Sequence, residues 1–137
     1  MLTIIRGLPG SGKSTYARSK KFGGALVLEN DMYRVHNHIY VFREEETHDA
    51  CTWCSEMCRE ALASQIDVVV ANTFTKTKYV KHYTDMAHNY GIPCCVVRCI
   101  GNFKSVHSVP DSVMKSMADT FEDWPGEDIV DFTQNKE

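Results

Sequence analysis

The chain has 137 residues, of which 43% are hydrophobic and 24% are charged, and its formal net charge at pH 7 is −3. This composition is that of a globular protein with one core, and it excludes a disordered chain or a chain with two domains. No apolar stretch approaches the length of a membrane span and no signal peptide is recognisable, so we expect a cytoplasmic protein without a membrane partner. The negative charge offers no global attraction to nucleic acid, although it is compatible with a local basic groove.

The first predicted element is a buried strand over residues 2–5, which leads into a glycine-rich loop. The loop follows the complete G-x-x-x-x-G-K-S pattern, and residues 15–18 continue behind it as a helix. In such a loop the backbone N–H groups point at phosphate oxygens, Lys13 reaches the outer phosphates, and the Ser14 hydroxyl holds Mg²⁺. The sequence therefore predicts a nucleoside triphosphate site. Its expected contacts are Gly7, Pro9, Gly10, Ser11, Gly12, Lys13, Ser14 and Thr15.

A second buried strand is predicted over residues 25–28, and Glu29, Asn30 and Asp31 follow it directly. In parallel α/β sheets the ligand binds beyond the carboxyl ends of the strands. A phosphotransferase needs a carboxylate there to orient or deprotonate the acceptor hydroxyl, and Asp31 is the candidate. Arg34 lies one helical turn further on and would project in the same direction. The alternative is that Asn30 or Asp31 only caps a helix.

One face of an amphipathic helix predicted over residues 47–64 carries potential metal ligands. They are His48, Cys51, Cys54 and Cys58. The same face continues through Ala61, Leu62 and Gln65, which is the spacing of a stripe that packs on a core. We therefore interpret these cysteines as small buried side chains, with a metal site as the alternative. All six cysteines of the chain are expected as free thiols, because cytosolic reductants keep thiols reduced.

A third strand is predicted over residues 67–71 and ends at Asn72 and Thr73, which we expect on the substrate side of the site. The end of this strand lacks the carboxylate that is typical of a motor or switch ATPase. This favours a kinase that acts on a small acceptor or on nucleic acid.

The next predicted helix contains apolar residues at helical spacing from residue 79 to residue 90, and Gly91 ends it. Lys76 and Lys78 lie at its start, where cations oppose the helix dipole. We therefore expect a negative group, such as a donor or acceptor phosphate, near this helix start, with Lys76 as a substrate contact.

A fourth strand is predicted over residues 94–100, and a loop without apolar periodicity follows it over residues 101–109. Because this loop lies between a strand and a helix, it could fold over the triphosphate as a lid. Its candidate cations for the transferring phosphoryl group are Lys104, His107 and Arg98.

The last predicted helix begins at Pro110, with Ser108 as its cap. Its expected inner face consists of Val113, Met114, Met117 and Phe121. The alternation of strands and helices predicts a three-layer αβα fold with a mainly parallel sheet of four to five strands. We expect a single domain over residues 1–137, with a core over about residues 1–122 and a partly frayed acidic tail over residues 123–137.

Four segments together resemble the polynucleotide-kinase-like P-loop kinases. They are Gly7–Thr15, Asn30–Arg34, the Asn72-Thr73 strand end, and Ser108-Val109-Pro110 with the helix that follows. In this order they are similar to the kinase domain of bacteriophage 5′-polynucleotide kinase and to zeta-toxin-like and AAA-type small P-loop ATP-binding proteins, including the ATP-binding domain of a ubiquitin-ligase-binding protein. The resemblance runs over about residues 2–122, and its most specific part beyond the loop is the D-x-x-R element from Asp31 to Arg34.

This resemblance implies a nucleoside-kinase-like P-loop NTPase fold, ATP and Mg²⁺ as cofactors, and transfer of the γ-phosphate to the 5′-OH end of DNA or RNA. It gives Asp31 the role of general base and Arg34 that of a contact to the acceptor phosphate. Lys104 would be the lid cation, where the family has an arginine with its bidentate fork. Asn72 stands where the phage enzyme has an aspartate. Both departures bear on the acceptor rather than on the fold.

Two alternatives to a polynucleotide kinase remain open on the sequence. A kinase for a small metabolite or nucleoside needs no basic groove, and it agrees better with the acidic net charge. A non-catalytic nucleotide-binding module that changes shape for a partner is the other.

Overall fold

The computed structural model describes residues 1–36, 39–40, 44–101 and 109–131, and for residues 34–36 and 39–40 it describes the backbone alone. The strands are β1 (Leu2–Arg6), β2 (Leu26–Leu28), β3 (Val35–His36), β4 (Ile39–Tyr40), β5 (Val68–Ala71), β6 (Cys94–Cys99) and β7 (Asp128–Val130). The helices are α1 (Lys13–Ala17), α2 (Thr47–Ala63), α3 (Thr77–Asn89) and α4 (Asp111–Thr120), with 3₁₀ turns η1 (Lys20–Phe22), η2 (Asn30–Arg34) and η3 (Glu44–Glu46).

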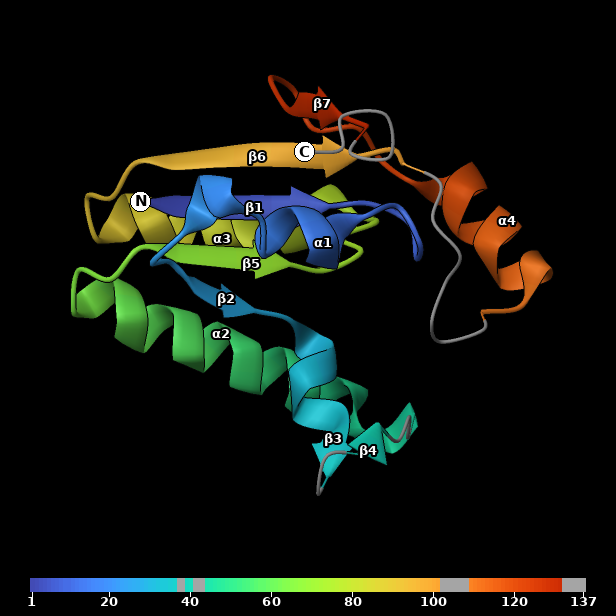
Figure 1. Cartoon of the computed structure of the whole chain (residues 1–137), viewed down its shortest axis with the longest axis horizontal. Coiled ribbons are helices and arrows are strands. Elements are labelled where there is room, and N and C mark those ends of the chain that lie inside the picture. The colour runs from blue at the N-terminus through green and yellow to red at the C-terminus, as the bar shows by residue number, and fades with distance from the viewer. Residues whose placement is uncertain (37–38, 41–43, 102–108, 132–137) are drawn as a thin grey trace.

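Five strands form one parallel sheet in the order β2-β5-β1-β6-β7, and β3 pairs with β4 in a separate antiparallel hairpin (Figure 1). Alternate residues of a strand point to opposite faces, so β1 contributes Leu2 and Ile4 to one face and Ile5 to the other. The three-layer αβα fold with a parallel sheet is therefore confirmed, and the four predicted strands occur in the predicted order with the predicted helices between them. The β3–β4 hairpin was not predicted.

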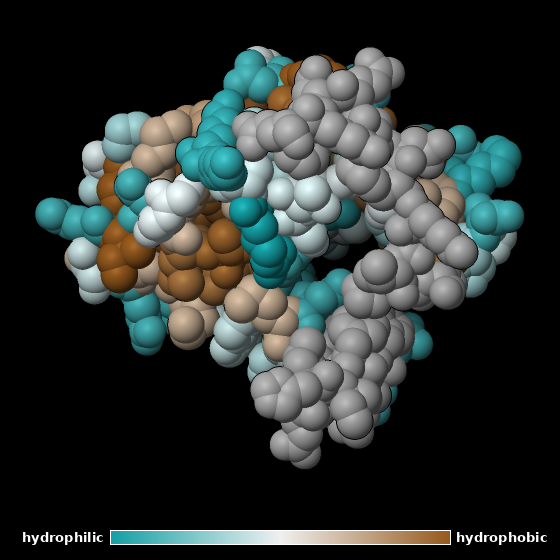
Figure 2. All heavy atoms as spheres, viewed as in Figure 1, coloured by the Kyte–Doolittle hydropathy of each residue, from teal (hydrophilic) through white to brown (hydrophobic). Residues whose placement is uncertain are grey.

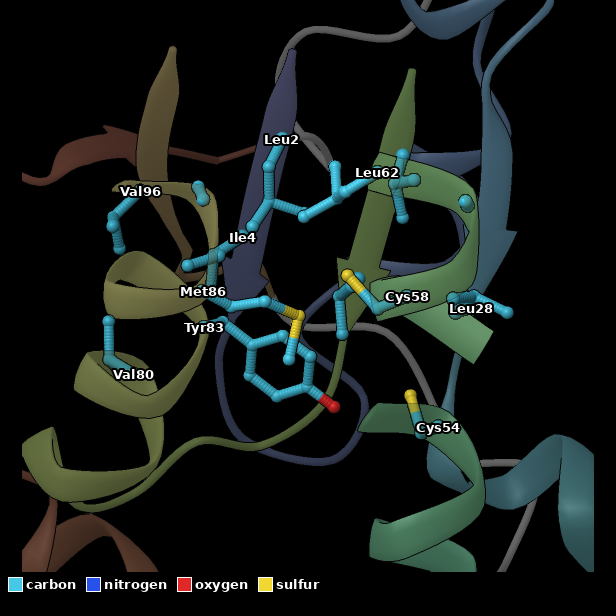
Figure 3. Close-up of a cluster of buried hydrophobic side chains, with 14 of the residues drawn as sticks. Leu2, Ile4, Leu28, Cys54, Cys58, Leu62, Val80, Tyr83, Met86 and Val96 are labelled. Carbon is cyan, nitrogen blue, oxygen red and sulfur yellow. The ribbon is translucent and has the colours of Figure 1, made fainter. Parts of the chain in front are cut away.

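The larger core lies where α2 and α3 cover one face of the sheet. Figure 3 shows Leu62 of α2 and Met86 of α3 meeting the strand residues Leu2 and Ile4 in this layer. On the other face, Tyr16 and Ala17 of α1 belong to a second cluster of buried residues. A parallel sheet needs cover on both faces, because its strands are buried on both sides.

The carboxyl-terminal part of the chain differs from the prediction in two ways. The segment expected to fray contributes β7, which extends the sheet beside β6. Helix α4, expected to bury an inner face, has no buried residue, and Val113 remains 40% exposed. An amphipathic pattern marks a helix but does not show that another element covers its apolar side. The expected cap Ser108 lies outside the described residues.

The cysteines of α2 are divided between the core and the surface. Cys54 and Cys58 are fully buried among the residues of the larger core, which confirms the core-packing interpretation for these two (Figure 3). His48 and Cys51 are exposed, so the core-packing interpretation is wrong for them. Over the described ranges, no group of three metal-binding side chains is found. The structure also describes all six cysteines as free thiols.

We expect iodoacetamide to modify Cys51 well before Cys58. Burial raises the pKa of the Cys58 thiol to about 12, so at pH 8 only about one such thiol in ten thousand is the reactive thiolate. Cys51 is exposed on the same helix and serves as the internal reference. Timed alkylation followed by peptide mass spectrometry measures the order, and in concentrated urea both should react alike. Equal rates in the folded protein would contradict the packing of α2.

Figure 2 shows hydrophobic side chains gathered on the left of the view, where the amino ends of β1, β5 and β6 lie in Figure 1. The exposed apolar residues Met1 and Ile66 belong to this end of the sheet. None of the described helices is long and apolar enough to cross a bilayer. The polar loops that follow β1, β2 and β5 lie at the opposite, carboxyl end of the sheet, where the candidate site is built.

Candidate nucleotide and acceptor site

The glycine-rich loop connects β1 to α1 at the carboxyl end of the sheet. Gly7 begins it in a place without room for a side chain, since a Cβ there would collide with Ser11 and lie 2.6 Å from the Cys99 carbonyl oxygen. Gly12 precedes α1 with a φ of 94°, a left-handed conformation that favours glycine. Two backbone hydrogen bonds fix the loop, from Ser11 N to Leu8 O at 3.0 Å and from Gly7 N to Thr73 O at 3.2 Å. Gly7 and Gly12 thus each have a geometric reason.

The charge and polarity inside the loop suit a phosphate group. The Lys13 ammonium donates to the Leu8 carbonyl oxygen at 3.0 Å. Burial lowers the pKa of Lys13, while Cys99, Glu29 and Asp31 act in the opposite direction. The Ser11 hydroxyl is buried in the loop without a hydrogen-bond partner among the described residues. Because a partly desolvated ammonium and an unpartnered hydroxyl both gain from an anion, these residues fit a triphosphate.

Glu29 joins the site as a residue that the sequence analysis did not single out. The Ser14 hydroxyl donates to Glu29 Oε1. The other carboxylate oxygen, Oε2, lies 2.7 Å from the Arg18 guanidinium. Hydroxyl and carboxylate oxygens are the ligands that Mg²⁺ prefers, so Ser14 and Glu29 together fit that ion. Its position in the sequence could have indicated Glu29 as a site residue, because it directly follows β2 and ligands bind beyond the carboxyl ends of parallel strands.

Asn72 ties the end of β5 to the end of β2. Its side-chain oxygen accepts from the Asn30 backbone N–H at 2.7 Å, and its amide nitrogen donates to Asn30 Oδ1 at 3.2 Å. Asn30 in turn donates to the sulfur of Cys51 at 3.2 Å. Asp31 follows Asn30 and is exposed at this edge of the sheet. The network therefore fixes the backbone from which the Asp31 carboxylate projects.

The other predicted acceptor-side residues are placed as follows. Thr73 is partly buried, and its carbonyl oxygen accepts the Gly7 hydrogen bond. Thr15 is exposed on α1. The Arg34 side chain, Lys104 and His107 lie outside the described residues.

The negative group at the start of α3 is a carboxylate of this chain. Glu122 Oε1 accepts hydrogen bonds from the backbone N–H of Thr77 at 2.8 Å and from its hydroxyl at 3.2 Å. The Lys76 ammonium donates to the Thr120 carbonyl oxygen at 3.1 Å. The hydrogen bonds from Thr77, mainly that from its backbone N–H, hold the pKa of the Glu122 carboxyl below its usual value. Lys76 as a substrate contact stays a prediction.

Arg98, a candidate phosphate cation in the sequence analysis, lies in an ion-pair cluster. Its guanidinium is 2.6 Å from an Asp123 carboxylate oxygen and 3.7 Å from one of Glu127. These two acids accompany it at the β6–β7 edge of the sheet.

Comparison with known proteins agrees with this fold. A family model described as an AAA domain matches residues 2–101. NEDD4-binding protein 2 from Homo sapiens is 30% identical over an alignment of 97 residues, and the match covers 67% of this chain and 6% of that protein. The chain thus spans only a small fraction of the length of this curated relative, and its likeness is confined to one part of it.

Three solved structures show the same fold at low sequence identity. APE1195 is 20% identical, with a TM-score of 0.64 over 99% of this chain and 86% of the other. A gluconokinase from Sinorhizobium meliloti 1021 is 19% identical, with a TM-score of 0.63 over 93% of this chain and 80% of the other. A chain of the Pnkp1/Rnl/Hen1 complex is 16% identical, with a TM-score of 0.60 over 84% and 38% of the two chains.

Proposed function

The chain belongs to the AAA domain family, and we propose that it is an ATP-dependent phosphotransferase that moves the γ-phosphate to the 5′-OH end of DNA or RNA. The observation that carries the proposal is that the phosphate-binding loop and a candidate general base lie at the same end of the sheet. The phosphate-binding loop with Lys13 follows β1 and Asp31 follows β2 at the same edge of the sheet, where Ser14 of the loop donates to Glu29, two residues before Asp31. A donor phosphate and an acceptor hydroxyl need such neighbouring sites.

In the proposed mechanism, the loop amides and Lys13 bind the β- and γ-phosphates. Ser14 and Glu29 would hold Mg²⁺, which when bound neutralises charge on the phosphates. Asp31 accepts the proton of the acceptor hydroxyl while the hydroxyl oxygen bonds to the γ-phosphorus. The bond between the γ-phosphorus and the β-phosphate oxygen breaks, and ADP leaves. Arg34 positions the acceptor, and Lys104 supplies positive charge from the loop that follows β6. Most of the catalysis is positioning and electrostatics.

The choice of a nucleic-acid acceptor is supported by the resemblance of the D-x-x-R element and by aromatic side chains beside it. The ring of Tyr33, two residues after Asp31, lies 6.2 Å from the ring of Trp53 in α2, measured between centroids. Aromatic faces suit the stacking of an unpaired base. The likeness in fold to a chain of the Pnkp1/Rnl/Hen1 complex agrees with this choice.

A kinase for a small metabolite is the second candidate. The net charge of −3 favours it, because a polyanionic acceptor gains nothing from an acidic protein. The likeness in fold to a gluconokinase is compatible with it as well. A non-catalytic nucleotide-binding module would use the same loop and leave Asp31 without a chemical role.

The test is transfer of labelled γ-phosphate from Mg-ATP to a panel of acceptors. The panel contains 5′-OH DNA and RNA oligonucleotides, the same oligonucleotides with 5′-phosphate, nucleosides, gluconate, and no acceptor. We expect label on 5′-OH oligonucleotides, none on the 5′-phosphorylated controls, and none with Lys13→Ala. Label on nucleosides or gluconate alone would replace the polynucleotide assignment by the metabolite kinase. Tight Mg-ATP binding without any transfer would favour the binding module.

A further inference from the structure

Arg6 is a fully buried charged side chain at the end of β1, directly before the phosphate-binding loop. Its Nε and Nη2 both donate to the Phe74 carbonyl oxygen, at 3.2 and 2.7 Å. Nη2 also donates to the Glu122 carbonyl oxygen at 2.6 Å, and Nη1 donates to Glu127 Oε1 at 3.0 Å. The guanidinium carbon lies 4.4 Å from the centre of the Phe121 ring. One side chain therefore connects the loop entrance to two distant parts of the chain.

The first of these parts is residues 121–127, here called the strap, which runs from the end of α4 to β7. Glu127 is 7% exposed and shares its carboxylate between Arg6 and the backbone N–H of Trp124, which it accepts at 3.1 Å. Arg98 also lies over the Phe121 ring, at 4.2 Å from its centre. The strap is thus held at the sheet edge by charged side chains of β1 and β6.

The second part is the turn at Thr73 and Phe74, between β5 and α3. Phe74 has a φ of 47°, a sparsely populated conformation for a residue with a side chain. Such a conformation persists only where its surroundings fix it, and the two Arg6 hydrogen bonds to the Phe74 carbonyl do so. The preceding carbonyl, that of Thr73, accepts the N–H of Gly7. Arg6 therefore fixes the turn that fixes the first residue of the loop.

We propose that Arg6 is a positioning residue for nucleotide binding, through which the strap sets the position of the phosphate-binding loop. The inference rests on the nucleotide-binding part of the proposed function and is independent of the acceptor. Coupling between two sites is reciprocal. If the ordered strap raises the affinity of the loop for nucleotide, bound nucleotide must raise the equilibrium constant for ordering of the strap by the same factor.

The first experiment uses the wild-type chain and amide hydrogen exchange with and without Mg-ADP. We expect Mg-ADP to slow exchange at the backbone N–H groups of Trp124 and Glu127, which bond within the strap. The N–H groups of Gln65 and Ile66, in the turn before β5 at the far end of the sheet, are the internal control. Protection of the strap without protection of this turn supports the proposal, and equal change at both contradicts it.

The second experiment compares Glu127→Gln with Asp123→Asn. Each substitution removes one carboxylate charge of the strap that pairs with Arg98. Of these two carboxylates, only that of Glu127 also contacts Arg6. We expect Glu127→Gln to raise the Kd for Mg-ADP about tenfold and Asp123→Asn to leave it nearly unchanged, a size typical of coupling between sites. Glu127→Gln should also speed amide exchange at residues 7–12 without nucleotide.

Each outcome of these two experiments decides the proposal. A folded Glu127→Gln protein with wild-type Mg-ADP affinity and wild-type exchange in the loop would overturn it. If Glu127→Gln does not fold, the wild-type exchange experiment decides alone. If the wild-type chain does not bind Mg-ADP, the proposed function fails, and the exchange of residues 7–12 in the two variants still tests the link from strap to loop.

Discussion

Replacing Asp31 by asparagine is expected to lower the turnover number of phosphoryl transfer by about 10³-fold and to change the Kd for Mg-ATP by less than about twofold. The amide has the size of the carboxylate but cannot accept the proton of the acceptor hydroxyl. Asn30 and Asn72 hold the backbone of this turn independently of the Asp31 side chain, so its position should persist. Steady-state transfer of labelled phosphate gives the turnover number, and calorimetric titration gives the Kd.

Asp67→Asn is the matched control for this variant. Asp67 directly precedes β5 at the opposite end of the sheet, where it forms an ion pair with the amino terminus at 2.8 Å. Its replacement should leave the turnover number unchanged. If Asp31→Asn also kept full turnover, Asp31 would serve only as a cap for η2. If it lost Mg-ATP binding instead, its role would belong to the nucleotide and not to the acceptor.

Replacing Arg6 by methionine is expected to lower the free energy of unfolding by about 3–5 kcal/mol, the usual effect of removing one partner of a buried ion pair. Glu127 would stay buried with only the more distant Arg98 as its counter-ion, and the carbonyl oxygens of Phe74 and Glu122 would lose their Arg6 donors. Urea denaturation followed by circular dichroism measures the change, and the midpoint should fall strongly at a similar slope.

Arg98→Met gives the comparison for Arg6→Met. Arg98 pairs with Arg6 in the register of β1 and β6 and also lies over Phe121, but its side chain is 25% exposed and its Asp123 partner 85% exposed. Ion pairs of this kind contribute about 1 kcal/mol or less. An Arg6→Met protein no less stable than Arg98→Met would contradict the central role of Arg6 in the carboxyl end of the fold.

The sheet and the loop could be predicted because their signals are local. Three of the four residues 2–5 are apolar, the glycines and Lys13 stand at fixed spacing, and Gly91 follows α3 where the helical pattern stops. The carboxyl ends of parallel strands share an edge, so the grouping of the loop with Asp31 and Asn72 also followed from the order of elements. Long apolar or glycine-rich segments of this kind specify their structure without help from distant residues.

The remaining features depend on residues far apart in sequence. The acid that pairs with Arg6 lies 121 positions later, and no spacing rule connects the two. The lysines at the start of α3 led us to expect a phosphate there, whereas in the folded chain the Glu122 carboxylate accepts the Thr77 N–H at this helix start. The apolar side of α4 was predicted to be covered because periodicity marks a face without showing what packs on it. Strand β7 was missed because it contains only two apolar residues, Ile129 and Val130, after Asp128.

The distance in sequence between Arg6 and Glu127 has a consequence for synthesis on the ribosome. β1, the central strand, pairs with strands that begin 66 and 92 residues after its own start. Chains dominated by such distant pairings fold slowly, since much of the loop entropy is lost before the contacts form. A nascent chain therefore holds the Arg6 guanidinium without its carboxylate until Glu127 has been synthesised. We expect stalled chains that end before residue 121 to be engaged by chaperones and sensitive to proteases.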